Sequence, residues 1–182
     1  MKVEEIMIKE NDRYGNTYDQ YGNIYTINAS VLLLFRITDT LGRAEIPKGI
    51  THIGEKVFKY CKKLTSITIP EGVTSIGRSA FHGCENLTSI TIPASVIRIG
   101  HYAFYHCKNL ASITIPEGVK YIDSYAFSSC KNLHSVILAE SVTSIDDRAF
   151  AYCTSLTAIS IPEGVTHIGE KAFHSCRALT SI

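Results

Sequence analysis

Hydrophobic positions along the chain recur at one fixed interval. The phenylalanines show this most clearly, because each lies 23 positions after the one before: Phe35, Phe58, Phe81, Phe104, Phe127, Phe150 and Phe173. The six cysteines keep the same step: Cys61, Cys84, Cys107, Cys130, Cys153 and Cys176. A fixed period of about 20 to 50 residues is typical of solenoids, whose stacked copies bury one continuous core. The pattern therefore predicts a single elongated domain.

Each copy contains the same predicted elements, as residues 70–92 illustrate. A Pro-Glu-Gly turn over 70–72 leads into an extended piece over 73–76. Apolar residues spaced one, three and four apart within 77–84 favour one or two helical turns. A strand with alternating inward residues over 87–92 closes the copy and predicts a long parallel sheet. The expected fold is a β-rich α/β solenoid with short helical turns, right-handed because crossovers join its parallel strands.

The repeat pattern also divides the chain. Six copies follow one another over 47–69, 70–92, 93–115, 116–138, 139–161 and 162–182, and the last is two residues short. Residues 1–46 are predicted to form an N-terminal cap that contains a degenerate first repeat. Strand-like segments over 24–27 and 31–37 predict a β-hairpin in this cap.

The C-terminal coil is expected to lack a cap of its own. Its apolar residues Phe173, Cys176, Leu179 and Ile182 have no polar capping copy after them. An uncovered solenoid end exposes core side chains and unpaired strand groups. We therefore expect residues 1–182 to be a fragment of a longer repeat protein, or this coil to be covered by another chain. End-to-end self-association is the corresponding hypothesis.

The copies share the pattern LxxIxIPxxVxxIGxxAFxxC, which resembles the BspA-like class of leucine-rich repeats over residues 47–182. The resemblance implies a leucine-rich-repeat arc that binds proteins, is not an enzyme and serves in cell-surface or secreted adhesion. Its implied partner is a host matrix or cell-surface protein. Two departures put the turn shape in doubt: Ala139 replaces the proline of the turn, and Ser95 and Ser141 replace the turn glycine.

Charge and hydropathy exclude several other classes of partner. A formal net charge of +1 gives no reason to expect nucleic acid or an anionic membrane as a partner. The longest purely apolar run, 31–35, is too short for membrane insertion. The N-terminal sequence lacks the apolar core of a signal peptide. The resemblance implies an extracellular or surface location. The missing signal peptide leaves two alternatives: the protein is cytoplasmic, or its leader was removed.

Residue types that could act in catalysis or metal binding recur with the repeat period and show no pattern of a single site. The shared phase of the cysteines indicates a buried column of free thiols, which are inert in apolar surroundings, rather than disulfides. The sequence has no CxxC or HxxxH pair and no glycine-rich phosphate loop. We therefore predict no catalytic, cofactor-binding or metal-binding residues.

The candidate binding surface comes from positions that vary between copies. In the middle copies these positions hold a cluster of rings: His101, Tyr102, Tyr105, His106, Tyr121 and Tyr125. Tyrosine is enriched at protein interfaces and their hot spots, which favours a protein-binding role. The alternative is that the rings only cover the outer side of each coil, as scattered surface aromatics do. The corresponding second function is a rigid architectural spacer, which should have a uniformly polar surface instead of one contiguous aromatic patch.

Overall fold

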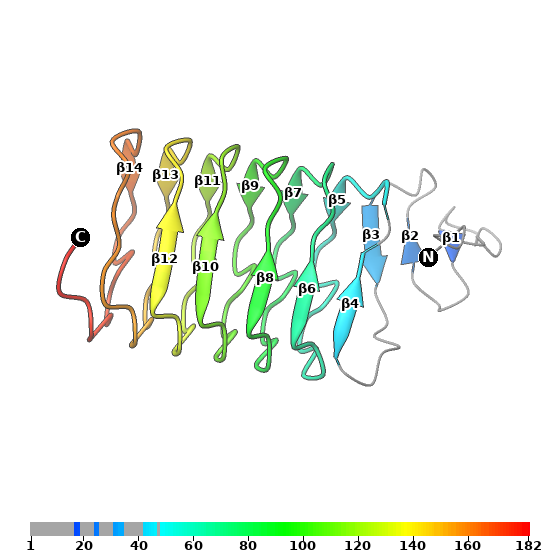
Figure 1. The fold of residues 1–182 in the computed structure, drawn as a ribbon, viewed down its shortest axis with the longest axis horizontal. Coiled ribbons are helices and arrows are strands. Elements are labelled where there is room, and N and C mark those ends of the chain that lie inside the picture. Colours follow the sequence, from blue (N-terminus) through cyan, green and yellow to red (C-terminus); the bar gives the residue numbers. More distant parts are fainter. Residues whose placement is uncertain (1–16, 19–23, 26–30, 35–41, 47) are drawn as a thin grey trace.

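The structure, a computed structural model, describes residues 17–18, 24–25, 31–34, 42–46 and 48–182. These residues form a β-solenoid in which successive coils stack side by side along one axis (Figure 1). Most coils contribute a short strand to one sheet and a longer strand to a second side of the solenoid. In the last two copies, isolated bridges at Ala158 and Ser181 take the place of the longer strand. The predicted parallel-sheet solenoid is therefore confirmed.

The first side of the solenoid is a nine-stranded sheet in the order β1-β2-β3-β5-β7-β9-β11-β13-β14. Its strands are β1 Thr17–Tyr18, β2 Ile24–Tyr25, β3 Val31–Leu34, β5 His52–Ile53, β7 Ser75–Ile76, β9 Arg98–Ile99, β11 Tyr121–Ile122, β13 Ser144–Ile145 and β14 His167–Ile168. β2 pairs antiparallel with β1 and β3, and β3 then pairs parallel with β5. The two segments predicted to form a hairpin are thus paired antiparallel, and β3 joins them to the solenoid. Their role as a cap stays a prediction, since most of residues 1–41 lie outside the described part of the chain.

The second side carries the longer strands β4 Arg43–Glu45, β6 Ser66–Thr68, β8 Ser89–Thr91, β10 Ser112–Ile115 and β12 Ser135–Leu138. They form the parallel sheets β4-β6-β8 and β10-β12, seen as the lower row of arrows in Figure 1. Each residue pairs with its counterpart in the next copy, as Ile113 does with Val136. The register therefore stacks equivalent side chains directly on one another along the solenoid.

The core consists of these stacked columns. The rings of Phe58, Phe81, Phe104, Phe127 and Phe150 are buried and stack face to face, with centroids 4.9 to 5.2 Å apart. The thiols form a second column beside the rings, and all six cysteines are free. Each thiol from Cys84 onward donates a hydrogen bond to the carbonyl of the phenylalanine 26 residues earlier, as in Cys107 Sγ to Phe81 O at 3.1 Å. Each of these carbonyls also accepts the N–H of the cysteine three residues later, as Phe81 O does from Cys84 N at 3.1 Å. The thiol is thus a second partner, which an alkyl side chain would not supply.

The predicted helical turns are wrong, because no helix occurs among the described residues. Within 77–84, Ser79 and Gly83 adopt left-handed backbone angles, with φ of 54° and 71°, and such residues interrupt a right-handed helix. The N–H groups of Ser79 and Phe81 donate to the next coil, at 2.8 and 2.7 Å. Alternate amides therefore bond between coils rather than to a residue four positions back. The described chain is all-β in character, and its third side consists of stacked turns.

The departures at the Pro-Glu-Gly corner are accommodated by side-chain hydrogen bonds. The Ser95 hydroxyl donates to Val73 O at 2.8 Å and accepts the N–H of Gly72 at 3.1 Å. Ser141 makes the same pair of bonds with the coil before it. The turn therefore stacks regularly at both positions.

Within the described residues, no helix of the length and hydrophobicity needed to cross a membrane is found.

Candidate functional site

The candidate rings lie mainly on the third side, where left-handed turns present them to solvent. Tyr102 and Tyr125 occupy equivalent positions in successive coils, with φ of 57° and 60°. Because neighbouring coils are in register, the two half-buried rings stack with centroids 4.7 Å apart and planes 12° apart. This pair is the centre of the candidate surface.

A continuous row of rings extends from that pair towards the N-terminal coils. Tyr105 meets Tyr102 edge to face at 5.6 Å, and His82 meets Tyr105 at 5.0 Å. Tyr60, 58% exposed, meets His82 at 5.0 Å. We call Tyr60, His82, Tyr105, Tyr102 and Tyr125 the aromatic ribbon. Aromatic pairs at such separations stabilise one another and present a large amphipathic area.

The rings predicted from the sequence coincide only in part with the aromatic ribbon. Tyr102, Tyr105 and Tyr125 belong to the ribbon, and His106 lies 5.9 Å from the Tyr105 ring. Tyr60 and His82 were missed, although Tyr60 has the same repeat phase as His106 and His82 the same phase as Tyr105. This shared repeat phase is the sequence signal that could have identified both residues.

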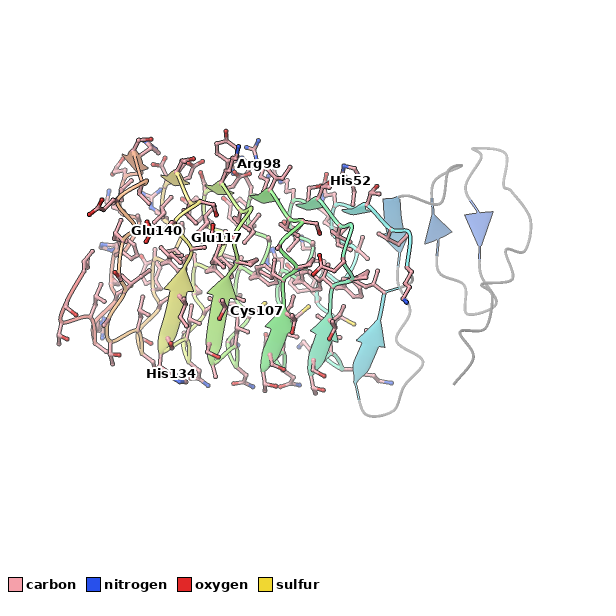
Figure 2. All side chains as sticks on the ribbon, turned by 45° about the horizontal axis from the view of Figure 1, so that its top comes forward. His52, Arg98, Cys107, Glu117, His134 and Glu140 are labelled. Carbon is pink, nitrogen blue, oxygen red and sulfur yellow. The ribbon has the colours of Figure 1, made fainter. Side chains whose placement is uncertain are left out.

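His101 and Tyr121 belong instead to a polar cluster around Asp123. The Arg98 Nε donates to both carboxylate oxygens of Asp123, at 2.9 and 3.0 Å, and the guanidinium lies 5.9 Å from the Tyr121 ring. His101 Nε2 lies 3.7 Å from Asp123 Oδ2. Asp123 is buried, whereas Arg98 projects outward from β9 (Figure 2). A buried carboxylate needs such partners, so this cluster has a structural explanation of its own.

Cationic groups border the ribbon. The Arg78 guanidinium lies 5.9 Å from the Tyr102 ring, and Lys59 Nζ lies 5.0 Å from the Tyr60 ring. The Arg148 guanidinium lies 5.6 Å from the Tyr125 ring and donates from Nη1 to its hydroxyl at 2.7 Å. Cation–π contacts within about 6 Å are attractive. They hold the charged groups against the rings.

The two histidines beside Tyr105 respond to the same environment. Burial lowers the pKa of His82, and the nearby charges of Lys59 and His106 lower it further. Burial likewise lowers the pKa of His106, with Lys108 and Lys131 adding to the effect and Glu85 opposing it. Both rings are therefore mainly neutral at pH 7, in a local potential that disfavours added positive charge.

One column of exposed acidic residues lies on a different part of the coil. Glu71, Glu117, Glu140 and Glu163 occupy the same position of the proline turn in their copies, and Glu117 and Glu140 lie on neighbouring coils (Figure 2). The solenoid thus separates an acidic turn column from the aromatic ribbon and its arginines. No group of three or more potential metal ligands occurs in the part of the chain that the structure describes.

Comparison with known proteins identifies the family. The BspA type leucine rich repeat region, in 6 copies, matches residues 33–131 and 74–182. The chain belongs to this family. Leucine-rich repeats of this kind are generally non-catalytic and mediate contacts between proteins. No curated protein matches the sequence significantly.

Several solved structures share the fold. A leucine-rich repeat protein from Bacteroides ovatus is 28% identical with a TM-score of 0.74, and the match covers 100% of this chain and 52% of that one. A leucine rich cell surface protein from Faecalibacterium prausnitzii is 32% identical with a TM-score of 0.62, covering 99% and 56%. The leucine-rich repeat protein of T. pallidum is 26% identical with a TM-score of 0.69, covering 94% and 91%. The BspA-type repeat chain therefore spans about half the length of the first two proteins.

Proposed function

We propose that this leucine-rich-repeat chain is a non-catalytic protein-binding module whose contact surface includes the aromatic ribbon. The observation that carries the proposal is the continuity of five rings across four coils, from Tyr60 to Tyr125, each in contact with the next. Tyrosines held by a rigid backbone lose little conformational entropy on binding and dominate many interfaces. A spacer with no ligand does not require such a row.

The proposed setting is the repeat region of a cell-surface or secreted adhesion protein, with a host matrix or cell-surface protein as ligand. One supporting observation is that a 32% identical structure is that of a leucine rich cell surface protein. Solenoids present extended surfaces suited to protein ligands. His101 and Tyr121 are proposed as peripheral contacts, because Asp123 and Arg98 hold them beside the ribbon rather than within it.

The second candidate function, a rigid architectural spacer, is favoured by the regular stacking. Threonines in equivalent positions donate to the carbonyl of the preceding coil, as Thr88 Oγ1 does to Thr65 O at 3.0 Å. Asparagine side chains continue the same ladder, since Asn132 Nδ2 donates to Asn109 Oδ1 at 3.1 Å. These bonds stiffen the stack without forming a ligand site. A spacer would tolerate loss of the ribbon without loss of function.

The test compares binding of wild-type and ribbon variants to immobilised matrix proteins and to intact host-cell layers. The double variant Tyr102→Asn/Tyr125→Asn removes the central rings, and asparagine suits the left-handed backbone at both positions. Tyr152→Asn is the matched control, because Tyr152 is likewise a surface tyrosine on left-handed backbone, with φ of 61°, but lies outside the ribbon. We expect the double variant to lose binding and the control to keep it. Equal binding of all three proteins would favour the spacer.

We also propose end-to-end self-association through the last coil. Ile168 and Ile182 are 49% and 68% exposed, and Phe173 is only half-buried. The N–H groups of Arg148, Phe150 and Tyr152 donate to the following coil, whereas no coil within residues 48–182 accepts from their counterparts in the last copy. Apolar side chains beside unpaired strand groups favour stacking on another chain.

A further inference from the structure

Two arginines mark the ends of the Tyr102–Tyr125 stack. Arg78 comes from the coil before Tyr102 and lies over that ring at 5.9 Å. Arg148 comes from the coil after Tyr125 and lies over it at 5.6 Å. The two rings between them are 4.7 Å apart. Four consecutive coils therefore present a line of cation, ring, ring and cation, which we call the arginine–tyrosine line.

The charges of this line are available to a ligand. Arg78 is exposed and forms no salt bridge with any residue that the structure describes. Arg148 uses one N–H for the Tyr125 hydroxyl, which leaves further donors of its guanidinium free. In contrast, the nearby Arg98 is already held by the buried carboxylate of Asp123.

The acidic groups whose charges reach Arg148 each have another direct partner. Glu170 Oε1 pairs with Lys171 Nζ at 2.6 Å, and Asp147 Oδ1 accepts the Glu170 N–H at 2.7 Å. The other side of the line is lined by the lysines that lower the pKa of His82 and His106. Lys108 of this group pairs with Glu85 at 3.2 Å, whereas Arg78 and Arg148 form no salt bridge with any residue that the structure describes. A negatively charged ligand would complement these two guanidinium groups.

The distance between the two arginines of the line matches the side-chain spacing of an extended peptide ligand. Arg78 and Arg148 come from coils three steps apart, which is about 14 Å at about 4.8 Å per coil. In an extended polypeptide, which rises about 3.4 Å per residue, side chains four positions apart lie on one face about 14 Å apart. The side chain midway between them falls over the stacked tyrosine rings. An acidic extended segment thus matches the line in charge, length and apolar centre.

We propose that the arginine–tyrosine line binds an extended acidic protein segment with carboxylates at positions i and i+4 and an apolar side chain at i+2. The proposal rests on the protein-binding function of the ribbon and gives the chemical class of its partner. Each guanidinium pairs with one carboxylate, in the planar geometry that arginine favours. The middle side chain packs on Tyr102 and Tyr125.

The experiment measures binding of labelled synthetic peptides to the whole chain by fluorescence anisotropy. The probe peptide contains Asp-Thr-Phe-Thr-Asp, a second replaces both aspartates by asparagine, and a third moves the second aspartate to i+3. We expect the first peptide to bind at least tenfold more tightly than the second and several-fold more tightly than the third, with affinity falling as salt is added. Arg78→Gln and Arg148→Gln should each weaken it about fivefold.

Lys171→Gln is the matched control, because Lys171 occupies the same left-handed position as Arg148 in the next coil but pairs with Glu170. Its affinity for the first peptide should equal that of the wild type. The proposal is overturned if the acidic peptide shows no binding at millimolar concentration, if charge or spacing makes no difference, or if the arginine variants bind normally. Tighter binding of a sulfated oligosaccharide at the same arginines would also overturn it, in favour of a glycan ligand.

These results separate the two proposals. If Tyr102→Asn/Tyr125→Asn abolishes capture of a matrix or cell-surface protein while Arg78→Gln and Arg148→Gln keep it, the protein-binding function stands and the acidic partner is wrong. If the aromatic double variant also keeps capture, the ribbon is not the contact surface.

Discussion

At the scale of single residues, equivalent positions in different coils make the same packing contacts and hydrogen bonds. Phe104 lies between Phe81 and Phe127 with ring centroids 5.0 and 5.1 Å away, and none of its surface is exposed. Each buried cysteine fills the space beside such rings and donates to a phenylalanine carbonyl. In each buried coil, the cysteine side chain thus fills space in the core and also gives the phenylalanine carbonyl a hydrogen bond.

Phe104→Ala should lower the free energy of unfolding by about 3–5 kcal/mol, because loss of a fully buried ring leaves a cavity between two neighbours. Urea-induced unfolding provides the measurement. Phe173→Ala serves as the control, since Phe173 is half-buried and, among the rings that the structure describes, stacks only on Phe150, at 5.7 Å. It should cost less than half as much. A loss below about 1 kcal/mol for Phe104→Ala would contradict the described core.

The thiols should react slowly in the native protein. Burial raises the pKa of Cys84 and of Cys130 to about 12, so at pH 8 only about one such thiol in 10,000 is ionised. Titration with a thiol reagent should label the half-buried Cys61 and Cys176 first, and denaturant should release all six. Rapid reaction of all six in the native state would show that the column is open to solvent.

At the scale of elements, the third side replaces a helix by turns that alternate between two kinds of hydrogen bond. Ala80 N donates to Gly77 O within the coil at 3.2 Å, and Phe81 N donates to Ala103 O in the next coil at 2.7 Å. Left-handed residues make this alternation possible. Three tyrosines of the ribbon, Tyr60, Tyr102 and Tyr125, are themselves left-handed residues, so the backbone that excludes a helix also shapes the candidate surface.

Gly83→Ala should destabilise the protein by about 1–2 kcal/mol, because an L-residue at φ of 71° is strained. The added Cβ would also lie 2.5 Å from Tyr60 Cδ1, so the Tyr60 ring must move. Thermal unfolding and the NMR shifts of Tyr60 report the two effects. Ser129→Ala is the matched control at the equivalent position, where φ is already 63° with a side chain present. It should change stability by less than about 0.5 kcal/mol.

At the scale of the whole molecule, every coil depends on its neighbours and on little else. The sheets pair each strand with its counterpart in the adjacent copy, so stability grows by contacts between neighbouring coils. The coil around Phe173 has one neighbour within residues 48–182, whereas the middle coils have two. This explains why Phe173 and Leu179 are only partly buried, although their counterparts in the middle coils are fully buried.

The self-association proposed for the last coil is tested by sedimentation over a concentration series. We expect the average mass of the chain to rise with concentration, and Leu179→Lys/Ile182→Lys to prevent the rise by placing charge at the exposed end. Ile137→Lys is the control, because Ile137 is 59% exposed but lies on β12 away from that end. A chain that stays monomeric at all concentrations would show that the last coil is stable without a partner.

The repeat, the register and the core of this protein could be predicted from the sequence alone. A fixed period places Phe81 under Phe104 in any stacked arrangement, because equivalent residues must fulfil equivalent roles. The burial of the cysteine column and the strands around Ile113 followed from the same periodicity. The family was evident at this level as well, since the repeat pattern is what defines it.

The form of the third side and the members of its surface depend on the tertiary structure. Apolar spacings of one, three and four suit a helix and the observed turns equally well, and the choice depends on hydrogen bonds between residues such as Phe81 and Ala103 in different coils. The edge-to-face contacts of His82 with Tyr60 and Tyr105 likewise depend on how rings from neighbouring coils are oriented. Contacts between coils are non-local, so the pattern within one copy could not specify them.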